Sequence, residues 1–512
     1  MFNQKNSASL RYKYDPAQIL TFIVIVLFST FVISKLSAFP LKWIMGIFLS
    51  IVFFITLSQI KNPKYVLLTL FTLSTLIFIN ARIYRDDDII RFQTVMSGYS
   101  LDLRDITLAL LYLIWLKESL SGVSRQISRR HLFNLPIVSF FLFTVWTSIS
   151  IIRTESFLVN NAFIAEIQYL QVLLILWYLI NNIRDKNHVY ALLIGAGIGC
   201  SLQSLLGVGQ KLLGRTINIP VISPKQITAF GVTGAGWEGG RVEGAFRHPN
   251  QLAKLLNTFI PVFLYIGIFH KMKLYQRTVL LGISFLCLLA VLYTLSRSGW
   301  VGLGISFAIG FVIIAYHKRV LLKTLLISTL LFFIITPPIL LTDNPFSRRI
   351  YNTSFSYTSP TYSRIPQFKA ALNYIIDKPF LGVGPMNYVL KLREYDDTLE
   401  QLPVRRSRTV HNTFLYYCAE NGIPALLLII VFFSSILYVG FRYMNRYAPP
   451  LNYVMIGFSA GILSNIIALT YTIFPLFQQW YLWIPVGIIY AIHLNFEKIS
   501  PENVLDAPSN ST

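Results

Sequence analysis

Long apolar runs recur from near the start of the chain to near its end, and no other feature restricts the possible folds as strongly. A helix that spans a bilayer needs about 20 mostly apolar residues, and about fourteen stretches of this sequence approach that length. Charged residues make up only 13% of the chain, whereas soluble domains carry about a quarter, so a soluble globular enzyme is excluded. The sequence therefore predicts an all-α, polytopic membrane protein with spans at approximately 19–36, 42–60, 65–80, 102–116, 135–152, 162–181, 189–208, 251–269, 278–296, 299–316, 321–341, 412–440, 452–473 and 478–495.

Basic residues in the short loops predict how these spans are oriented. The chain carries 44 Lys and Arg against 22 Asp and Glu, a net charge of +22, and every second loop is basic. Because Lys and Arg concentrate in cytoplasmic loops, we expect these loops and both termini in the cytoplasm, and in a bacterium the opposite side would be periplasmic or extracellular. The first apolar run is expected to be a retained anchor, because no clear small-residue cleavage site follows it. The basic loops are 61–64, 117–134, 182–188, 270–277, 317–320 and 441–451.

Three long loops are then expected on the outer face, at about 81–101, 209–250 and 342–410. Long loops on a fixed scaffold often carry binding and catalytic residues. These loops are rich in cations, and arginine binds phosphate through two parallel hydrogen bonds. The surface cations of 391–408 are explained more simply as anchors for ordinary phospholipids. Four arginines in motif-like settings are candidates to bind a phosphate or diphosphate headgroup: Arg241, Arg247, Arg297 and Arg364.

The middle of the last outer loop has the pattern of a short amphipathic helix that Ser363 can cap and Pro379 ends. This helix is too short to cross a membrane, so we expect it to lie on the outer surface, with Arg364 at its start. The next segment, Phe380–Pro385, contains a Gly-x-Gly that is weak evidence for nucleotide binding, because no strand precedes it. The apolar face of the helix consists of Ile365, Phe368, Leu372, Ile375 and Ile376.

Histidines and acids at or inside the spans are further candidates. His411 enters the twelfth span from the outer face, and its ordinary pKa range suits proton transfer near neutral pH. Glu420 follows nine positions later, about 13 Å along a helix, which is too far for direct pairing with His411. Glu420 and Glu166 are intramembrane acids with either a structural or a functional role. Asn250 is expected to cap the eighth span, and His248 beside it to be structural.

Metal and cofactor sites are not predicted. Cys200, Cys287 and Cys418 are dispersed, without a metal-binding spacing, and are expected to be small core residues. The acidic run 86–88 is interpreted as a solvated turn rather than a cation site.

Several of these stretches, taken in order, resemble the O-antigen ligase and polymerase superfamily of bacterial polysaccharide assembly. The resemblance covers roughly residues 240–440. The ligase motif of this superfamily is His, then Asn, Ser or Gln, nine residues, Gly, two residues and usually a second Gly. Here His411, Asn412 and Gly422 match, and Ala425 replaces the last glycine. The other matching stretches are Arg241 to Asn250, Thr294 to Trp300, and Arg364 to Pro385.

This resemblance implies a metal-independent glycosyltransferase that uses a polyprenyl-diphosphate-linked glycan as donor and a glycan or lipid as acceptor. It implies that His411 assists the attacking hydroxyl, that Asn412 contacts substrate, and that Arg241, Arg247, Arg297 and Arg364 bind the diphosphate. Nucleic acid is not an expected partner. Arginines can neutralise the charge that develops on a departing diphosphate without a metal, so the chemistry agrees with the residues.

The expected organisation is an N-terminal set of spans at 1–240, a ligase-like core at 241–440, and C-terminal spans with a cytoplasmic tail at 441–512. Ligase and polymerase remain open, because acceptor choice depends on loops without a readable pattern. The alternative from another class is a polysaccharide flippase or other transporter, which often contains internal repeats; no clear repeat relates the two halves. A non-catalytic scaffold is the other alternative, and it should tolerate loss of His411.

Overall fold

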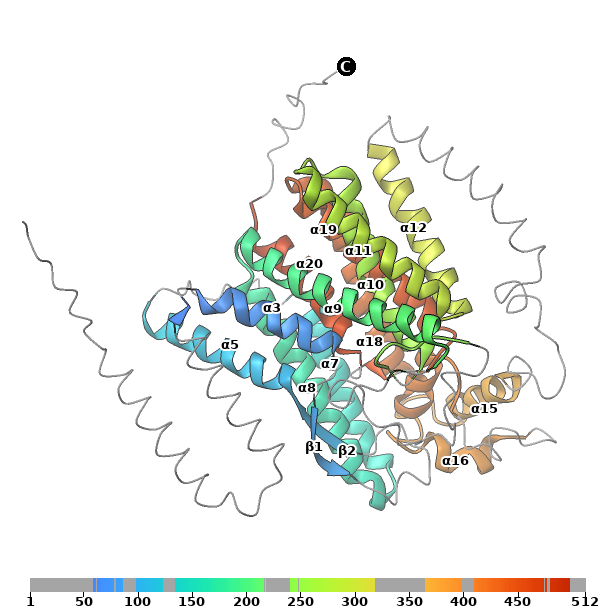
Figure 1. Cartoon of the computed structure of the whole chain (residues 1–512). Coiled ribbons are helices and arrows are strands. Elements are labelled where there is room, and N and C mark those ends of the chain that lie inside the picture. Colours follow the sequence, from blue (N-terminus) through green and yellow to red (C-terminus); the bar gives the residue numbers. More distant parts are fainter. Residues whose placement is uncertain are drawn as a thin grey trace, which may run out of the picture. The chain divides into compact units, whose positions relative to one another are not determined.

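The computed structural model describes residues 59–60, 62–77, 80–85, 98–122, 134–215, 217, 240–246, 248–317, 364–397, 409–473, 475–476 and 479–497 (Figure 1). The contacts reported below lie within the compact unit Tyr65–Thr512. Of the predicted site residues, Arg247 lies outside the described residues, as does the acidic run 86–88.

Thirteen α-helices lie in this described part of the chain. Within the same described ranges, seven helical segments, which contain α7 to α11, α18 and α19, are long and apolar enough to cross a membrane, judged by length and composition. The chain is therefore a polytopic helical membrane protein, as predicted. The helices are α3 (Pro63–Leu76), α5 (Leu103–Leu120), α7 (Leu135–Ser150), α8 (Val159–Asn182), α9 (Lys186–Leu213), α10 (Pro249–Phe269), α11 (Leu274–Tyr293), α12 (Arg297–His317), α15 (Arg364–Asp377), α16 (Tyr388–Tyr395), α18 (Thr413–Tyr443), α19 (Leu451–Leu469) and α20 (Trp480–Asn495).

The predicted spans from 65–80 to 299–316, and the last three, each coincide with one of these helices. Predicted spans 19–36 and 321–341 lie outside the described residues, as does 42–60 apart from its last two positions. The predicted surface helix is also present, as α15. One element departs from the all-helical prediction: strands β1 (Asn80–Arg85) and β2 (Gly98–Asp102) pair antiparallel in the first long loop. Both strands alternate polar and apolar residues, a pattern typical of a short strand.

Loops that were predicted on the same side of the membrane contact one another. At the predicted outer end, Arg241 Nε donates to the Thr294 carbonyl at 2.9 Å. At the same predicted end, the Thr413 hydroxyl donates to the Thr472 carbonyl at 2.9 Å. These hydrogen bonds join loops that follow different spans, so they support the predicted alternation of the chain.

The opposite ends of the helices make similar contacts. The Asn495 amide, at the end of α20, donates to the Ile183 carbonyl at 2.9 Å. The Tyr65 hydroxyl of α3 donates to the Asp185 carboxylate at 3.5 Å. Both contacts join segments for which the basic loops predicted a cytoplasmic position.

Helices α10 and α19 pack against each other (Figure 1). Gly457 and Gly461 of α19 lie against the backbone of Val262 and Thr258 in α10, so a side chain at either glycine would overlap that backbone. Asn465 donates to the Thr258 hydroxyl at 2.5 Å across the same interface. Small residues and interhelical hydrogen bonds are the usual means of joining helices in a bilayer.

A buried charged cluster explains the most polar of the predicted spans. Arg104 of α5 lies 3.0 Å from Asp102 and 2.9 Å from Asp105, and its guanidinium stacks 3.4 Å above the Trp480 ring of α20. The three charges therefore pair at the first turn of α5, and the rest of that helix is mostly apolar.

Candidate functional site

A break in α18 organises the site. Gly422 has φ 83° and ψ 174°, which is not helical, and Pro424 has no amide hydrogen. In a continuous helix, the amides of residues 423 and 424 would donate to the carbonyls of Ala419 and Glu420. The break leaves these two carbonyls without helical donors, and buried carbonyls need a donor from elsewhere.

The loop that follows α15 supplies those donors. Val383 N donates to Ala419 O at 3.0 Å, and Gly384 N donates to Glu420 O at 2.9 Å. In return, Ile423 N donates to the Pro379 carbonyl at 2.7 Å. The outer loop and the spanning helix are thereby joined through their backbones at the break.

The two glycines of the Phe380–Pro385 segment are required by this docking. Gly382 has φ +63°, and a Cβ there would overlap the backbone of Glu420. Gly384 has φ +96° and lies against the backbone at Arg153. The Gly-x-Gly therefore allows the loop backbone to approach neighbouring backbone closely. This structural role agrees with the sequence analysis, in which the motif was weak evidence for nucleotide binding.

His411 lies two residues before the first residue of α18 and is half-buried. Its Nδ1 lies 2.8 Å from Oε1 of Gln367 in α15, the helix that begins at Arg364. The structure therefore brings His411 to the helix that carries one of the predicted arginines. Asn412 is the N-cap of α18, and its side-chain oxygen accepts from Leu415 N at 3.0 Å. Its predicted contact with substrate stays a prediction.

Glu420 is connected to this region through α16. Its carboxylate accepts from Tyr388 N, the first residue of α16, at 3.2 Å. The Tyr388 hydroxyl donates to the Gln367 carbonyl at 3.3 Å, and burial raises the pKa of Tyr388 well above its usual value. Although Glu420 and His411 are too far apart along α18 to pair, α15 and α16 connect them.

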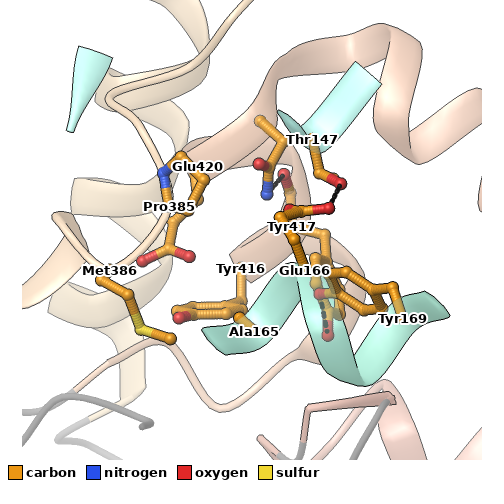
Figure 2. A pocket seen from close by; sticks show the side chains of 10 residues that line it. Thr147, Ala165, Glu166, Tyr169, Pro385, Met386, Tyr416, Tyr417 and Glu420 are labelled. Carbon is orange, nitrogen blue, oxygen red and sulfur yellow. Dashed lines mark hydrogen bonds between the residues drawn. The ribbon is translucent and has the colours of Figure 1, made fainter. Parts of the chain in front are cut away.

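A small cavity between α8 and α18 is lined by both intramembrane acids (Figure 2). Glu166 accepts hydrogen bonds from Thr147 and Ser148, each at 3.1 Å. On the same lining, the Tyr169 hydroxyl donates to the Tyr417 hydroxyl at 3.0 Å, as the dashed line in Figure 2 shows. Both acids therefore make hydrogen bonds that support the packing.

Two of the four predicted arginines form a second group at the turn between α11 and α12. Arg241 uses Nε for the Thr294 carbonyl and Nη2 for Asn250 Oδ1 at 3.0 Å. Arg297, three positions after Thr294, begins α12 and is half-buried. The turn therefore brings Arg241 and Arg297 to one region.

The expected cap of the eighth span is wrong by two residues. His248 is the N-cap of α10, and its Nδ1 accepts from Asn250 N at 3.1 Å. The Asn250 side chain instead accepts from Arg241. Pro249 fits the first helical position because its missing amide hydrogen is not needed there, so the cap falls on the residue before it. The structural role expected for His248 is confirmed.

Helix α19 packs near both parts of the site, the residues around His411 and the group of Arg241 and Arg297. Gly302 of α12 lies against the backbone of Ser464 in α19, and Thr472, just beyond the end of α19, accepts from Thr413 of α18. Helix α19 and the residues just after it therefore contact α12, which begins at Arg297, and α18, which follows His411.

Lys254 was missed in the sequence, and it lies one turn after Asn250 in α10. It is 1% exposed and is the only Lys, Arg, Asp or Glu in that helix. A charged residue inside an apolar span is a functional candidate by default, so its position in the predicted span 251–269 was a usable signal. Gln367 was missed because nothing in an amphipathic pattern marks one buried glutamine.

The three cysteines are buried and form no disulfide with one another, as expected for core residues. Within the described ranges, no group of three or more His, Cys, Asp and Glu side chains is placed to share a metal ion.

Residues 282–430 match the family model described as O-Antigen ligase. The match begins in α11 and ends in α18, and it includes Arg297, α15, the docked glycine loop, His411 and Gly422. No curated protein shows significant similarity to the chain. Residues 282–430 of this multi-pass membrane protein therefore form a domain of the O-antigen ligase family.

Proposed function

We propose that the protein is a membrane glycosyltransferase that transfers or polymerises a polyprenyl-diphosphate-linked glycan on the outer face of the inner membrane. The observation that carries the proposal is the position of His411. It lies at the entrance of a spanning helix, within the family match, at the end of the helices where the predicted outer segments meet. A donor whose diphosphate lies at headgroup level would present its reacting bond at that depth.

The proposed reaction is one displacement. The oxygen of an acceptor hydroxyl forms a bond to the anomeric carbon of the donor glycan. The bond between that carbon and the phosphate oxygen breaks, and its electron pair remains on the polyprenyl diphosphate. The hydroxyl proton passes to the imidazole of His411 as general base, a role that suits the ordinary pKa range of histidine.

Arginines would stabilise the leaving group. Negative charge grows on the diphosphate as the bond breaks, and fixed cations aimed at that charge lower the barrier. Arg297 and Arg364 are half-buried at the starts of α12 and α15, and Arg241 is held beside the α11–α12 turn. We propose these three, together with Arg247, as the diphosphate-binding residues, and the bidentate geometry of guanidinium supports the assignment.

The test is a gel assay of the purified protein in lipid, with a polyprenyl-diphosphate-linked oligosaccharide as donor. Samples contain or lack a lipid A-core acceptor and are compared with the His411→Ala variant. A ladder of longer lipid-linked glycans identifies a polymerase, and a single shift of the acceptor identifies a ligase. Both products should disappear in the variant.

Two outcomes would contradict the proposal. If a correctly inserted His411→Ala protein formed as much product as the wild type, His411 could not be the general base. Absence of any product with a competent donor, together with movement of that donor across the bilayer, would establish a transporter instead.

A further inference from the structure

We infer that Gln367 is a positioning residue that fixes the ring tautomer of His411 and so leaves Nε2 as the nitrogen that receives the proton. The observation that supports this inference is the 2.8 Å distance between His411 Nδ1 and Gln367 Oε1. The inference rests on the proposed role of His411 as general base, and it names the partner that prepares that base.

The chemistry of the two groups decides the direction of this hydrogen bond. An amide oxygen can only accept, so Nδ1 must carry the hydrogen and donate it to Gln367. In neutral imidazole, one nitrogen carries the hydrogen and the other has the free lone pair. With the hydrogen on Nδ1 of His411, the lone pair is on Nε2, on the side of the ring away from Gln367.

Gln367 is itself held in place. It is 1% exposed, and its backbone carbonyl accepts from the Tyr388 hydroxyl at 3.3 Å. Tyr388 is in turn fixed through its own carbonyl, which accepts from the Tyr374 hydroxyl at 2.7 Å. The acceptor of the His411 hydrogen therefore belongs to a packed unit of α15 and α16, as a residue that orients a catalytic ring requires.

Charged and titratable groups on the packed elements define the electrostatic setting of His411. On α15, the charged residues nearest in sequence to Gln367 are Lys369, two positions after it, and Arg364, three positions before it, and on α16 the nearest titratable residue is Tyr388. Helix α18 contributes Tyr416 and Glu420, and Tyr471 follows α19. Gln367 is neutral, so it fixes the tautomer without adding a charge next to the ring.

The first experiment measures turnover against pH for two variants. Gln367→Leu keeps a similar volume but removes the acceptor, so kcat should fall about 10- to 100-fold, while KM for the donor changes little. Gln367→Glu keeps an acceptor and adds a negative charge. That charge stabilises protonated His411, so the acid limb of the profile should move to higher pH. Gln168→Leu in α8 is the matched control and should keep the wild-type profile.

The second experiment is nitrogen NMR of the 15N-histidine-labelled protein in lipid, with the His411 signals assigned by their loss in His411→Asn. Wild-type His411 should show the Nδ1–H tautomer in its neutral form, and Gln367→Leu should show a mixture. This readout does not depend on the reaction catalysed. A ring that carries its hydrogen on Nε2, or that keeps its tautomer and pH profile in both variants, would overturn the inference.

The two proposals fail differently. If His411→Ala keeps full turnover, the base assignment fails whatever the Gln367 variants do. If His411→Ala is inactive while Gln367→Leu and Gln367→Glu match the wild type, only the role of Gln367 fails.

Discussion

Gly422 of α18 lies so close to the carbonyl of Phe380 that no side chain fits between them. Its φ of +83° also belongs to the left-handed region, which glycine adopts without a steric penalty. The relationship explains why a glycine stands at a fixed distance after His411: it marks the point where the outer loop pairs with the broken helix.

Gly422→Ala should therefore unfold the site. The added methyl group meets a backbone carbonyl that cannot move aside, and the backbone conformation alone costs about 1–3 kcal/mol for a residue other than glycine. We expect a lower melting temperature in detergent, measured by fluorescence size-exclusion after heating. We also expect loss of glycan transfer, measured by the gel assay.

Gly282→Ala in α11 is the control for this change. A Cβ at Gly282 meets nothing within 4 Å, and alanine favours a helix by about 1 kcal/mol over glycine. It should melt at or slightly above the wild-type temperature. Equal melting of the two variants would show that the close approach at Gly422 does not constrain the fold.

The helices could be predicted from the sequence, because each apolar run must satisfy its own backbone within the bilayer. The loop 380–385 could not be placed in the same way. Its hydrogen bonds go to Ala419 and Glu420, and only the folded chain brings these groups together. The motif therefore showed that Gly422 mattered without showing what contacts it.

The candidate site was predictable to a similar extent. Arg297 and Arg364 begin α12 and α15, and His411 lies just before α18, so all three are next to helices that the sequence predicted, whereas Arg241 lies in the predicted loop before α10. The partner of His411 was not predictable, because Gln367 reaches it through tertiary packing of α15. Arg241 holds Thr294 and Asn250, a structural task that its sequence position did not indicate.

Arg297→Lys should reduce donor binding, although it keeps the charge. Lysine offers one compact cation and cannot form the paired hydrogen bonds that guanidinium makes with phosphate. We expect a raised KM for the donor, about 10-fold, with normal insertion and melting, and a larger loss for Arg297→Ala. Steady-state kinetics over a donor series is the measurement, and Lys273→Ala, in the predicted cytoplasmic loop, serves as control. Full activity of Arg297→Lys would favour simple lipid anchoring.

Transfer should survive removal of divalent cations. If arginines balance the charge of the departing diphosphate, then no metal has to do so. Protein and donor pretreated with EDTA, and assayed with and without added magnesium, should give the same rates. A rate that collapses in EDTA and returns with magnesium would contradict the metal-free mechanism.

Asn387→Ala should separate two outer segments. Asn387 is fully buried. Its side-chain amide donates to Arg153 O at 2.8 Å and to Val383 O at 2.7 Å. Its side-chain oxygen accepts from Glu155 N at 3.2 Å. Each buried group left without a partner costs about 1–3 kcal/mol. We expect a clear drop in melting temperature, and increased proteolysis near residue 155. Unchanged protection of that segment would show that other contacts suffice to hold it.

Two substitutions at Glu420 separate structure from charge. The Glu420 carboxylate accepts from Tyr388 N inside the protein, so Glu420→Ala leaves a buried amide without its acceptor, at a cost of about 1–3 kcal/mol. Glu420→Gln retains an acceptor oxygen and should melt closer to the wild type. Because Tyr388 also contacts Gln367, the alanine variant should lose activity together with stability, whereas the glutamine variant should keep most of both. A glutamine variant that is stable but inactive would show that the reaction needs the carboxylate itself, and Glu420 would then join His411 as a functional group.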